Sequence, residues 1–90
     1  MEVLYESAFL RDLKRIRSKS TRRRILEAIE KVKEAPTIQD IPNMVKLRGY
    51  EAYFRIRVGE YRLGVEMVDE TVIFVCCLHR KDVYRYFPPG

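Results

Sequence analysis

The sequence lacks the features that define several classes of protein. No stretch approaches the roughly 20 apolar residues of a membrane-spanning helix, and no basic segment followed by an apolar one opens the chain as a secretion signal would. Two cysteines and four glycines among 90 residues exclude a disulfide scaffold and a collagen-like chain. A glycine-rich phosphate loop and a histidine-rich metal pattern are also missing. We therefore expect a cytoplasmic protein that needs no metal and no cofactor.

The sequence does contain enough apolar material for one small core. Apolar residues make up 47% of the chain and charged residues 34%, so residues 1–90 are expected to form a single folded domain. Cys76 and Cys77 are neighbours in an apolar run, and adjacent side chains of a strand point to opposite faces. They should be separate buried thiols, and with His79 they make a poor zinc site.

The charge is basic and unevenly distributed. Eighteen Lys and Arg residues against thirteen Asp and Glu residues give a net charge of +5. Eight of the basic residues lie in residues 1–24 and eight more lie from Lys46 onward. A basic domain of this kind favours a nucleic acid or an acidic protein as its partner.

The first half of the sequence predicts a strand at residues 2–5 and then two helices. In the first helix Phe9, Leu13 and Ile16 recur at helical spacing, and Ser7 is expected to be the N-cap.

The second helix is expected at residues 21–35, between the cap Ser20 and the helix-breaking Pro36. A short connection between two basic amphipathic helices predicts an antiparallel helical hairpin.

The second half of the sequence changes to the period of two that strands have. Gly59-Glu60 suits a two-residue type II′ turn, because the first position of that turn needs a positive φ. A strand, two helices and a meander predict an α+β fold, with the helices packed on one face of a twisted, mainly antiparallel sheet. The strands of the meander are expected at residues 45–48, 52–58, 61–67 and 71–78.

The register that this turn sets gathers arginines on one face of the sheet. Arg57 lies opposite Arg62, and Arg55 lies opposite Gly64, while the apolar side chains share the other face. Like charges across a strand pair destabilise a sheet by up to about 1 kcal/mol, and only Glu66 could offset them on this face. The arrangement predicts a site for phosphate, which guanidinium groups bind well. Removal of Arg62 should then leave the fold intact or slightly more stable.

A second group of polar residues follows the last strand. His79, Arg80, Lys81 and Tyr84 lie where the chain leaves the sheet, a place that often carries function. His79 could transfer a proton and Tyr84 could stack on a base or orient a hydroxyl. The alternatives are an edge histidine and a tyrosine that packs on the sheet.

Taken in order, these segments resemble the RelE/ParE superfamily of toxin–antitoxin toxins, and the RelE branch most. The resemblance covers essentially the whole chain and is strongest from Lys46 to Tyr84. It rests on four segments: Lys46-Leu47-Arg48-Gly49, Phe54-Arg55-Ile56-Arg57-Val58, Glu60-Tyr61-Arg62-Leu63 and His79-Arg80-Lys81-Asp82-Val83-Tyr84.

The resemblance implies a small endoribonuclease that cleaves mRNA in the ribosomal A site and is neutralised by a cognate antitoxin. It implies the RelE-like microbial RNase fold and metal-independent attack of a ribose 2′-hydroxyl on the adjacent phosphate. The candidate catalytic residues are Arg55, Arg57, Arg62, Arg80, Lys81, Tyr84 and His79. The candidate RNA-binding residues are Lys46, Arg48, Arg55, Arg57, Arg62 and Arg85.

The identity of the general base stays open at this point. RelE has lysines where this chain has Arg55 and Arg57, and arginine is a poor base because its pKa lies above about 12. Tyr84 and His79 are the remaining candidates. The ribosome could position the RNA and complete the site.

Two other functions share the predicted fold. A ParE-like protein would inhibit DNA gyrase by binding it, and a non-catalytic module would bind RNA or protein. The partner expected of a toxin with net charge +5 is an acidic, RelB-like antitoxin in a hetero-oligomer. Residues 84–90 are too short and too rich in proline for a stable helix, so Tyr86 or Phe87 should hold this segment against the sheet.

Overall fold

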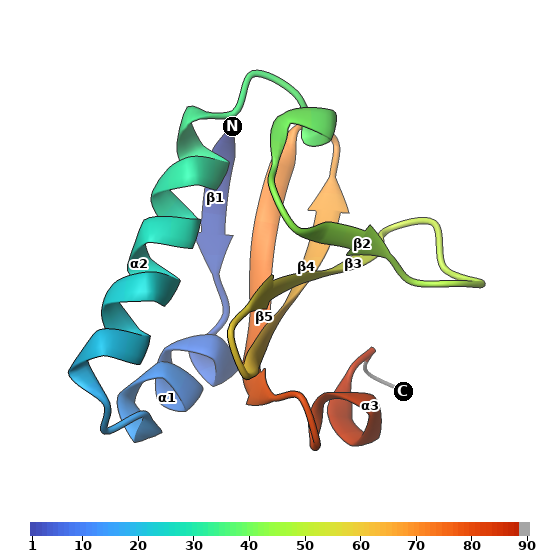
Figure 1. Ribbon diagram of the computed structural model, residues 1–90. Helices are drawn as coiled ribbons and strands as arrows, with labels where there is room; N and C mark the ends of the chain where they lie inside the picture. Colours follow the sequence, from blue (N-terminus) through green and yellow to red (C-terminus); the bar gives the residue numbers. More distant parts are fainter. Residues whose placement is uncertain (89–90) are drawn as a thin grey trace.

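The computed structural model describes residues 1–88, which form one five-stranded sheet with helices packed on it (Figure 1). The strand order is β1-β5-β4-β3-β2; β1 runs parallel to β5, and the other neighbours are antiparallel. The predicted α+β fold class is confirmed. The elements are β1 Glu2–Tyr5, α1 Ser7–Arg15, α2 Lys19–Glu34, the 3-10 turn η1 Ile38–Asp40, β2 Met44–Lys46, β3 Tyr53–Val58, β4 Tyr61–Val68, β5 Thr71–His79 and α3 Val83–Tyr86.

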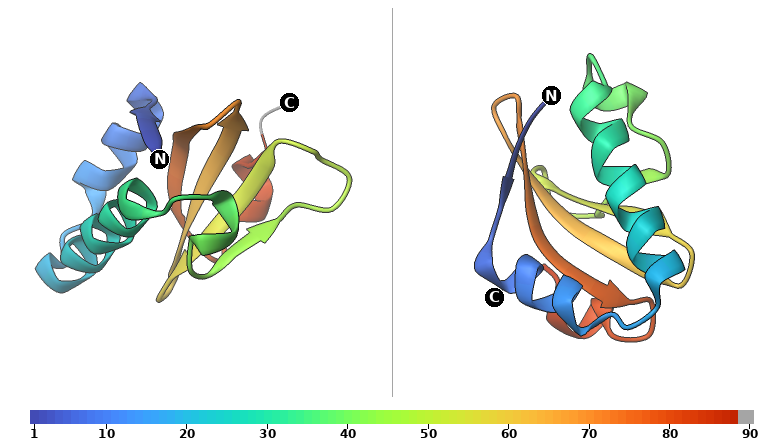
Figure 2. Two further views of the ribbon diagram at one scale, coloured as in Figure 1. Left: turned by 90° about the horizontal axis from the view of Figure 1, so that it is seen from above. Right: turned by 90° about the vertical axis from the view of Figure 1, so that its left-hand side faces the viewer.

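Helices α1 and α2 cover one face of the sheet (Figure 2). The apolar stripes that the sequence predicts are buried there, with Phe9 from α1 and Ile25 from α2 fully inaccessible. They pack against Leu63, Val65 and Phe74 of the sheet in the main core. No helix within residues 1–88 is both long and apolar enough to cross a bilayer.

The helices differ from the predictions at their starts but not in their mutual arrangement. Ser7 is the first residue of α1, and Ser18 rather than Ser20 is the N-cap of α2, because the Ser18 hydroxyl accepts the N–H of Thr21 at 3.2 Å. The predicted antiparallel hairpin is confirmed: α1 and α2 are joined by residues 16–18 and run in roughly opposite directions on the same face of the sheet (Figure 2).

The hairpin of β3 and β4 has the predicted register. Val58 pairs with Tyr61, Arg57 with Arg62, and Gly59 turns the chain with a φ of +58°. Because paired residues share a face, the arginines of both strands lie on the side away from α1 and α2.

A second, smaller core lies on that side and positions the end of the chain. Val75 has no partner opposite it, since the register of β4 against β5 shifts between Gly64 and Val65. This bulge places both Val75 and Cys76 in the small core, while Cys77 joins the main one. The two thiols are therefore buried on opposite faces, as predicted.

The C-terminal segment is anchored on the small core by α3. This single turn was not predicted, because its local sequence has little helical propensity; it forms because Val83 and Phe87, four residues apart, are both buried. Phe87 packs on the sheet as expected, whereas Tyr86 is 62% exposed. Residues 89–90, which complete the C-terminal segment expected to lie against the sheet, are outside the residues that the structure describes.

Candidate functional site

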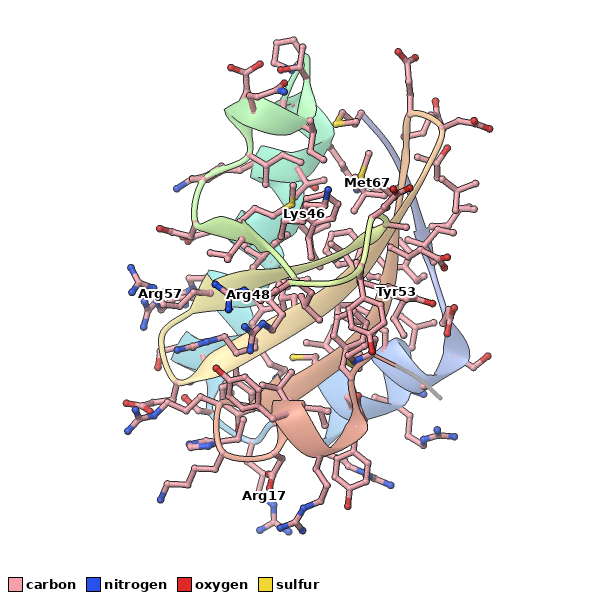
Figure 3. The ribbon with its side chains drawn as sticks, turned by 90° about the vertical axis from the view of Figure 1, so that its right-hand side faces the viewer. Arg17, Lys46, Arg48, Tyr53, Arg57 and Met67 are labelled. Atoms are coloured by element: carbon pink, nitrogen blue, oxygen red, sulfur yellow. The ribbon has the colours of Figure 1, made fainter. Side chains whose placement is uncertain are left out.

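The arginine-rich face of the hairpin forms an open pocket. Arg57 and Arg62 lie directly opposite each other, and Arg55 lies two pairs further along, opposite Gly64. Figure 3 looks onto this face and shows Arg57 at its margin. The pocket has a volume of about 370 Å³ and is lined by Ile41, Asn43, Met44, Val45, Arg55, Arg57, Arg62 and Tyr84.

Tyr84 joins this pocket from the far end of the chain. The guanidinium carbon of Arg55 lies over its ring, 4.5 Å from the centroid, in a cation–π contact. The ring is otherwise open to solvent, with 75% of its surface exposed. Because Val83 and Phe87 fix the backbone on either side, the tyrosine is held in place while its hydroxyl stays accessible.

The arginines of this face differ in how their charge is satisfied. Nη1 of Arg62 donates to the carbonyl oxygens of Gly59 at 2.9 Å and Tyr61 at 3.0 Å, so this side chain braces the turn. Nε of Arg80 lies 2.6 Å from Oε2 of Glu60. Within residues 1–88, the guanidinium group of Arg57 has neither a carboxylate within 4.0 Å nor a hydrogen-bond acceptor.

His79 lies on the other face of the sheet. It pairs with Tyr61, and the two rings meet edge to face with centroids 5.6 Å apart. Tyr61 packs on the main core, whereas Arg62 and its partner Leu78 face the opposite side. Nδ1 of His79 accepts the backbone N–H of Lys81 at 3.2 Å. The structure therefore brings Tyr84, and not His79, to the arginines.

The remaining candidates surround the pocket or lie apart from it. Lys46 pairs with Phe54, which packs on the main core, so it points away from the arginines (Figure 3). Arg48 lies on the arginine side, in front of the sheet, in the same view. Lys81 and Arg85 are exposed in the turn after β5 and on α3, and neither lines the pocket.

The buried cysteines are not part of this site. Burial raises the pKa of the Cys76 thiol to about 11 and that of Cys77 to about 12, and the carboxylate of Asp12 adds to both shifts. Oδ2 of Asp12 accepts the backbone N–H of Cys77 at 3.1 Å. These thiols are protonated and unreactive near neutral pH.

Comparison with known proteins agrees with this geometry. A family model described as "ParE toxin of type II toxin-antitoxin system, parDE" matches residues 3–84. Toxin RelE3 of Methanocaldococcus jannaschii is 42% identical over 89 residues, which is 98% of this chain and 100% of the relative. The chain belongs to the RelE/ParE toxin superfamily.

Solved structures of relatives support the same assignment. The toxin chain in the RelB–RelE antitoxin–toxin complex from Methanococcus jannaschii superposes with a TM-score of 0.78 at 40% identity, over 94% of this chain and 99% of that one. The archaeal RelE–RelB complex from Pyrococcus horikoshii gives 0.71 at 22% identity over 88% and 93%, a likeness of fold alone. This chain is thus a toxin of a type II toxin–antitoxin system and a homologue of RelE.

One residue near the toxin's arginines was not anticipated from the sequence. Arg24 of α2 lines a second pocket with Arg57, Arg62 and Arg80. Nothing in the local sequence distinguishes Arg24 from Arg22 and Arg23. Only the packing of α2 across the hairpin brings it there.

Proposed function

We propose that this toxin is an endoribonuclease that cleaves mRNA on the ribosome and thereby inhibits translation. The observation that carries the proposal is the pocket in which Tyr84, Arg55, Arg57 and Arg62 meet. Three arginines on one face, with no carboxylate lining their pocket, fit a substrate with a high density of negative charge.

The chemistry that these residues support is transesterification without a metal. A ribose 2′-hydroxyl loses its proton and attacks the adjacent phosphorus in line, and the 5′-oxygen of the next nucleotide leaves and takes up a proton. Arg57 and Arg62 stabilise the charge that develops on the phosphate oxygens. Their pKa lies too high for them to act as the base.

Tyr84 is the better candidate for proton transfer within this pocket. Its hydroxyl is exposed and its ring is held by Arg55, whereas His79 lies on the other face of the sheet. The pocket is open rather than enclosed, so correct placement of the RNA must come from a larger surface. The ribosome can supply that placement, and cleavage would then depend on translation.

The proposed partner of the toxin is an acidic, RelB-like antitoxin. Two of the relatives of known structure are complexes of RelE with RelB, and a net charge of +5 favours an acidic chain. The two proteins would form a hetero-oligomer in which the antitoxin covers the arginines or displaces Tyr84.

Mapping of mRNA ends tests the proposal. Wild-type toxin added to a translating extract should produce new 5′-hydroxyl ends within codons, and far fewer in an extract whose initiation is blocked. Arg57→Ala should abolish these ends, whereas the control Lys14→Ala on α1 should retain them. The alternative outcome is inhibition of DNA gyrase, as expected of a ParE-like protein, because the description of the matching family model names the ParE toxin. Intact mRNA together with lost DNA supercoiling would replace this proposal with that one.

A further inference from the structure

A second basic pocket lies at the turn between β3 and β4. It has a volume of about 500 Å³ and borders the pocket that contains Tyr84, since Arg57 and Arg62 line both. Its walls come from α2, the segment before β2, the hairpin and the residue after β5. The lining residues are Arg24, Asn43, Arg57, Gly59, Glu60, Arg62 and Arg80.

Arg24 reaches this pocket because Gly59 has no side chain. A β-carbon at position 59 would lie 2.8 Å from Nη1 of Arg24 and 3.4 Å from its Cζ, so the guanidinium rests directly against the turn. The part of α2 that follows Arg24 is fixed by the packing of Ile25 and Ile29 in the main core. The fold therefore fixes the backbone of Arg24 beside the turn, within reach of this pocket.

The charges of this pocket are not balanced. Glu60 is the one carboxylate among its lining residues, and it pairs with Arg80 at 2.6 Å. Arg62 donates to the carbonyls of Gly59 and Tyr61. Within the described part of the chain, the guanidinium groups of Arg24 and Arg57 have no hydrogen-bond acceptor and no carboxylate within 4.0 Å. Two unpaired guanidinium groups in one pocket repel each other unless an anion lies between them.

We propose that this pocket binds a second phosphate of the RNA, next to the scissile one, and that Arg24 is the residue that holds it. The proposal rests on the proposed ribonuclease function. Because the two pockets share Arg57 and Arg62, a strand whose scissile phosphate lies beside Tyr84 can place a neighbouring phosphate against Arg24. Arg24 would bind substrate without touching the reacting atoms, so its loss should raise KM and leave kcat nearly unchanged.

The test combines a protein variant with a change in the RNA. Ribosomes are programmed with short mRNAs in which one phosphate at a time is replaced by a neutral methylphosphonate, and kcat and KM for cleavage are measured. For the wild-type toxin, one position beside the cleavage site should raise KM by about 10- to 150-fold, the range expected for a charge-assisted hydrogen bond. Arg24→Ala should show a similar increase with unmodified mRNA and no further increase at that position.

Matched variants separate this role from a structural one. Arg23→Ala removes a neighbouring exposed arginine that does not line the pocket and should behave as wild type. Arg24→Lys retains the charge and should recover part of the loss. The inference is wrong if Arg24→Ala cleaves like Arg23→Ala, or if it stays sensitive to the same methylphosphonate. If wild-type toxin cleaves none of the programmed mRNAs, the proposed function itself fails, and that outcome is visible before any variant is made.

Discussion

Arg55 and Tyr84 stand 29 positions apart in the sequence, yet the guanidinium of one lies 4.5 Å from the ring centroid of the other. The contact joins a strand of the hairpin to the segment after the last strand. The guanidinium of Arg55 holds the ring of Tyr84 and leaves the tyrosine hydroxyl accessible. The contact is with an aromatic ring, so the positive charge of Arg55 is not neutralised by a carboxylate. A tyrosine held in this way can act on a phosphate bound by the neighbouring arginines.

The first prediction concerns the hydroxyl of Tyr84. Tyr84→Phe keeps the ring over which Arg55 lies and removes only the hydroxyl. If the hydroxyl transfers a proton, cleavage of ribosome-bound mRNA should fall by about 10²-fold or more, the usual contribution of general acid–base catalysis. Thermal unfolding should be unchanged, because the side chain is exposed. Cleavage at the wild-type rate would mean that Tyr84 is only a stacking residue, and that the proton is transferred by another group.

The second prediction separates two arginines that the sequence treats alike. Arg57→Ala relieves repulsion and loses no hydrogen bond, so the free energy of unfolding should stay the same or rise by up to about 0.5 kcal/mol. Arg62→Ala loses its bonds to Gly59 and Tyr61 and should destabilise the fold by about 1 kcal/mol. The two hydrogen bonds of Arg62 thus argue against the expectation that its removal leaves the fold intact or slightly more stable. Urea unfolding of both variants measures the difference, and equal stabilities would contradict it.

The sequence predicts best what local geometry determines. A two-residue turn and a period of two define the register of β3 against β4, and hence the face that carries Arg55, Arg57 and Arg62. The first residue of a helix is harder to predict than the register of a hairpin. Ser18 and Ser20 lie only about half a helical turn apart and either could be the N-cap of α2, which in the structure is Ser18.

What could not be predicted depends on contacts between distant segments. The bulge at Val75 sets which residues of β5 share a face with Arg62, and it has no local signature. The position of Arg24 depends on how α2 crosses the hairpin. The α3 turn forms because Val83 and Phe87 find a buried surface, although its local sequence opposes a helix.

The third prediction concerns stability at high pH. Burial raises the pKa values of Cys76 and Cys77 from 9.0 to about 11 and about 12. The folded state therefore holds these protons more tightly than the unfolded chain does. Their contribution to stability is complete below pH 9 and is lost as the pH rises through 11 to 12. The difference in unfolding free energy between wild type and a Cys76→Ala/Cys77→Ala variant should shrink over this range, and a constant difference would contradict the assignment.

The fourth prediction concerns the antitoxin. Association with an acidic partner should be fast at low salt and should slow steeply as salt is added, because steering between unlike charges is screened. The exposed basic residues of α1 and α2 contribute to this field, so Lys14→Glu combined with Arg23→Glu should lower the association rate more than the dissociation rate changes. Stopped-flow mixing measures both rates. An association rate that is insensitive to salt would exclude an acidic partner.

The last prediction concerns the anchor of Tyr84. Phe87 is 3% exposed, its ring meets that of Tyr53 edge to face at 5.4 Å, and its N–H donates to the carbonyl of Val83 at 2.9 Å. A toxin that ends after Phe87 keeps this anchor and should cleave mRNA like the full chain. A toxin that ends after Tyr86 differs by one residue, loses the anchor, and should lose most of its activity although Tyr84 is still present.

Gly64 tests the same anchor from the other side. A β-carbon at this buried position would lie 2.6 Å from Sγ of Cys76 and 2.8 Å from the ring of Phe87. Gly64→Ala should therefore displace Phe87, destabilise the fold by about 1–3 kcal/mol, and lower activity in the full-length chain. Because the chain that ends after Tyr86 has no Phe87 ring, Gly64→Ala should destabilise it less. Equal destabilisation of the two chains would mean that the ring does not hold Tyr84 through this contact.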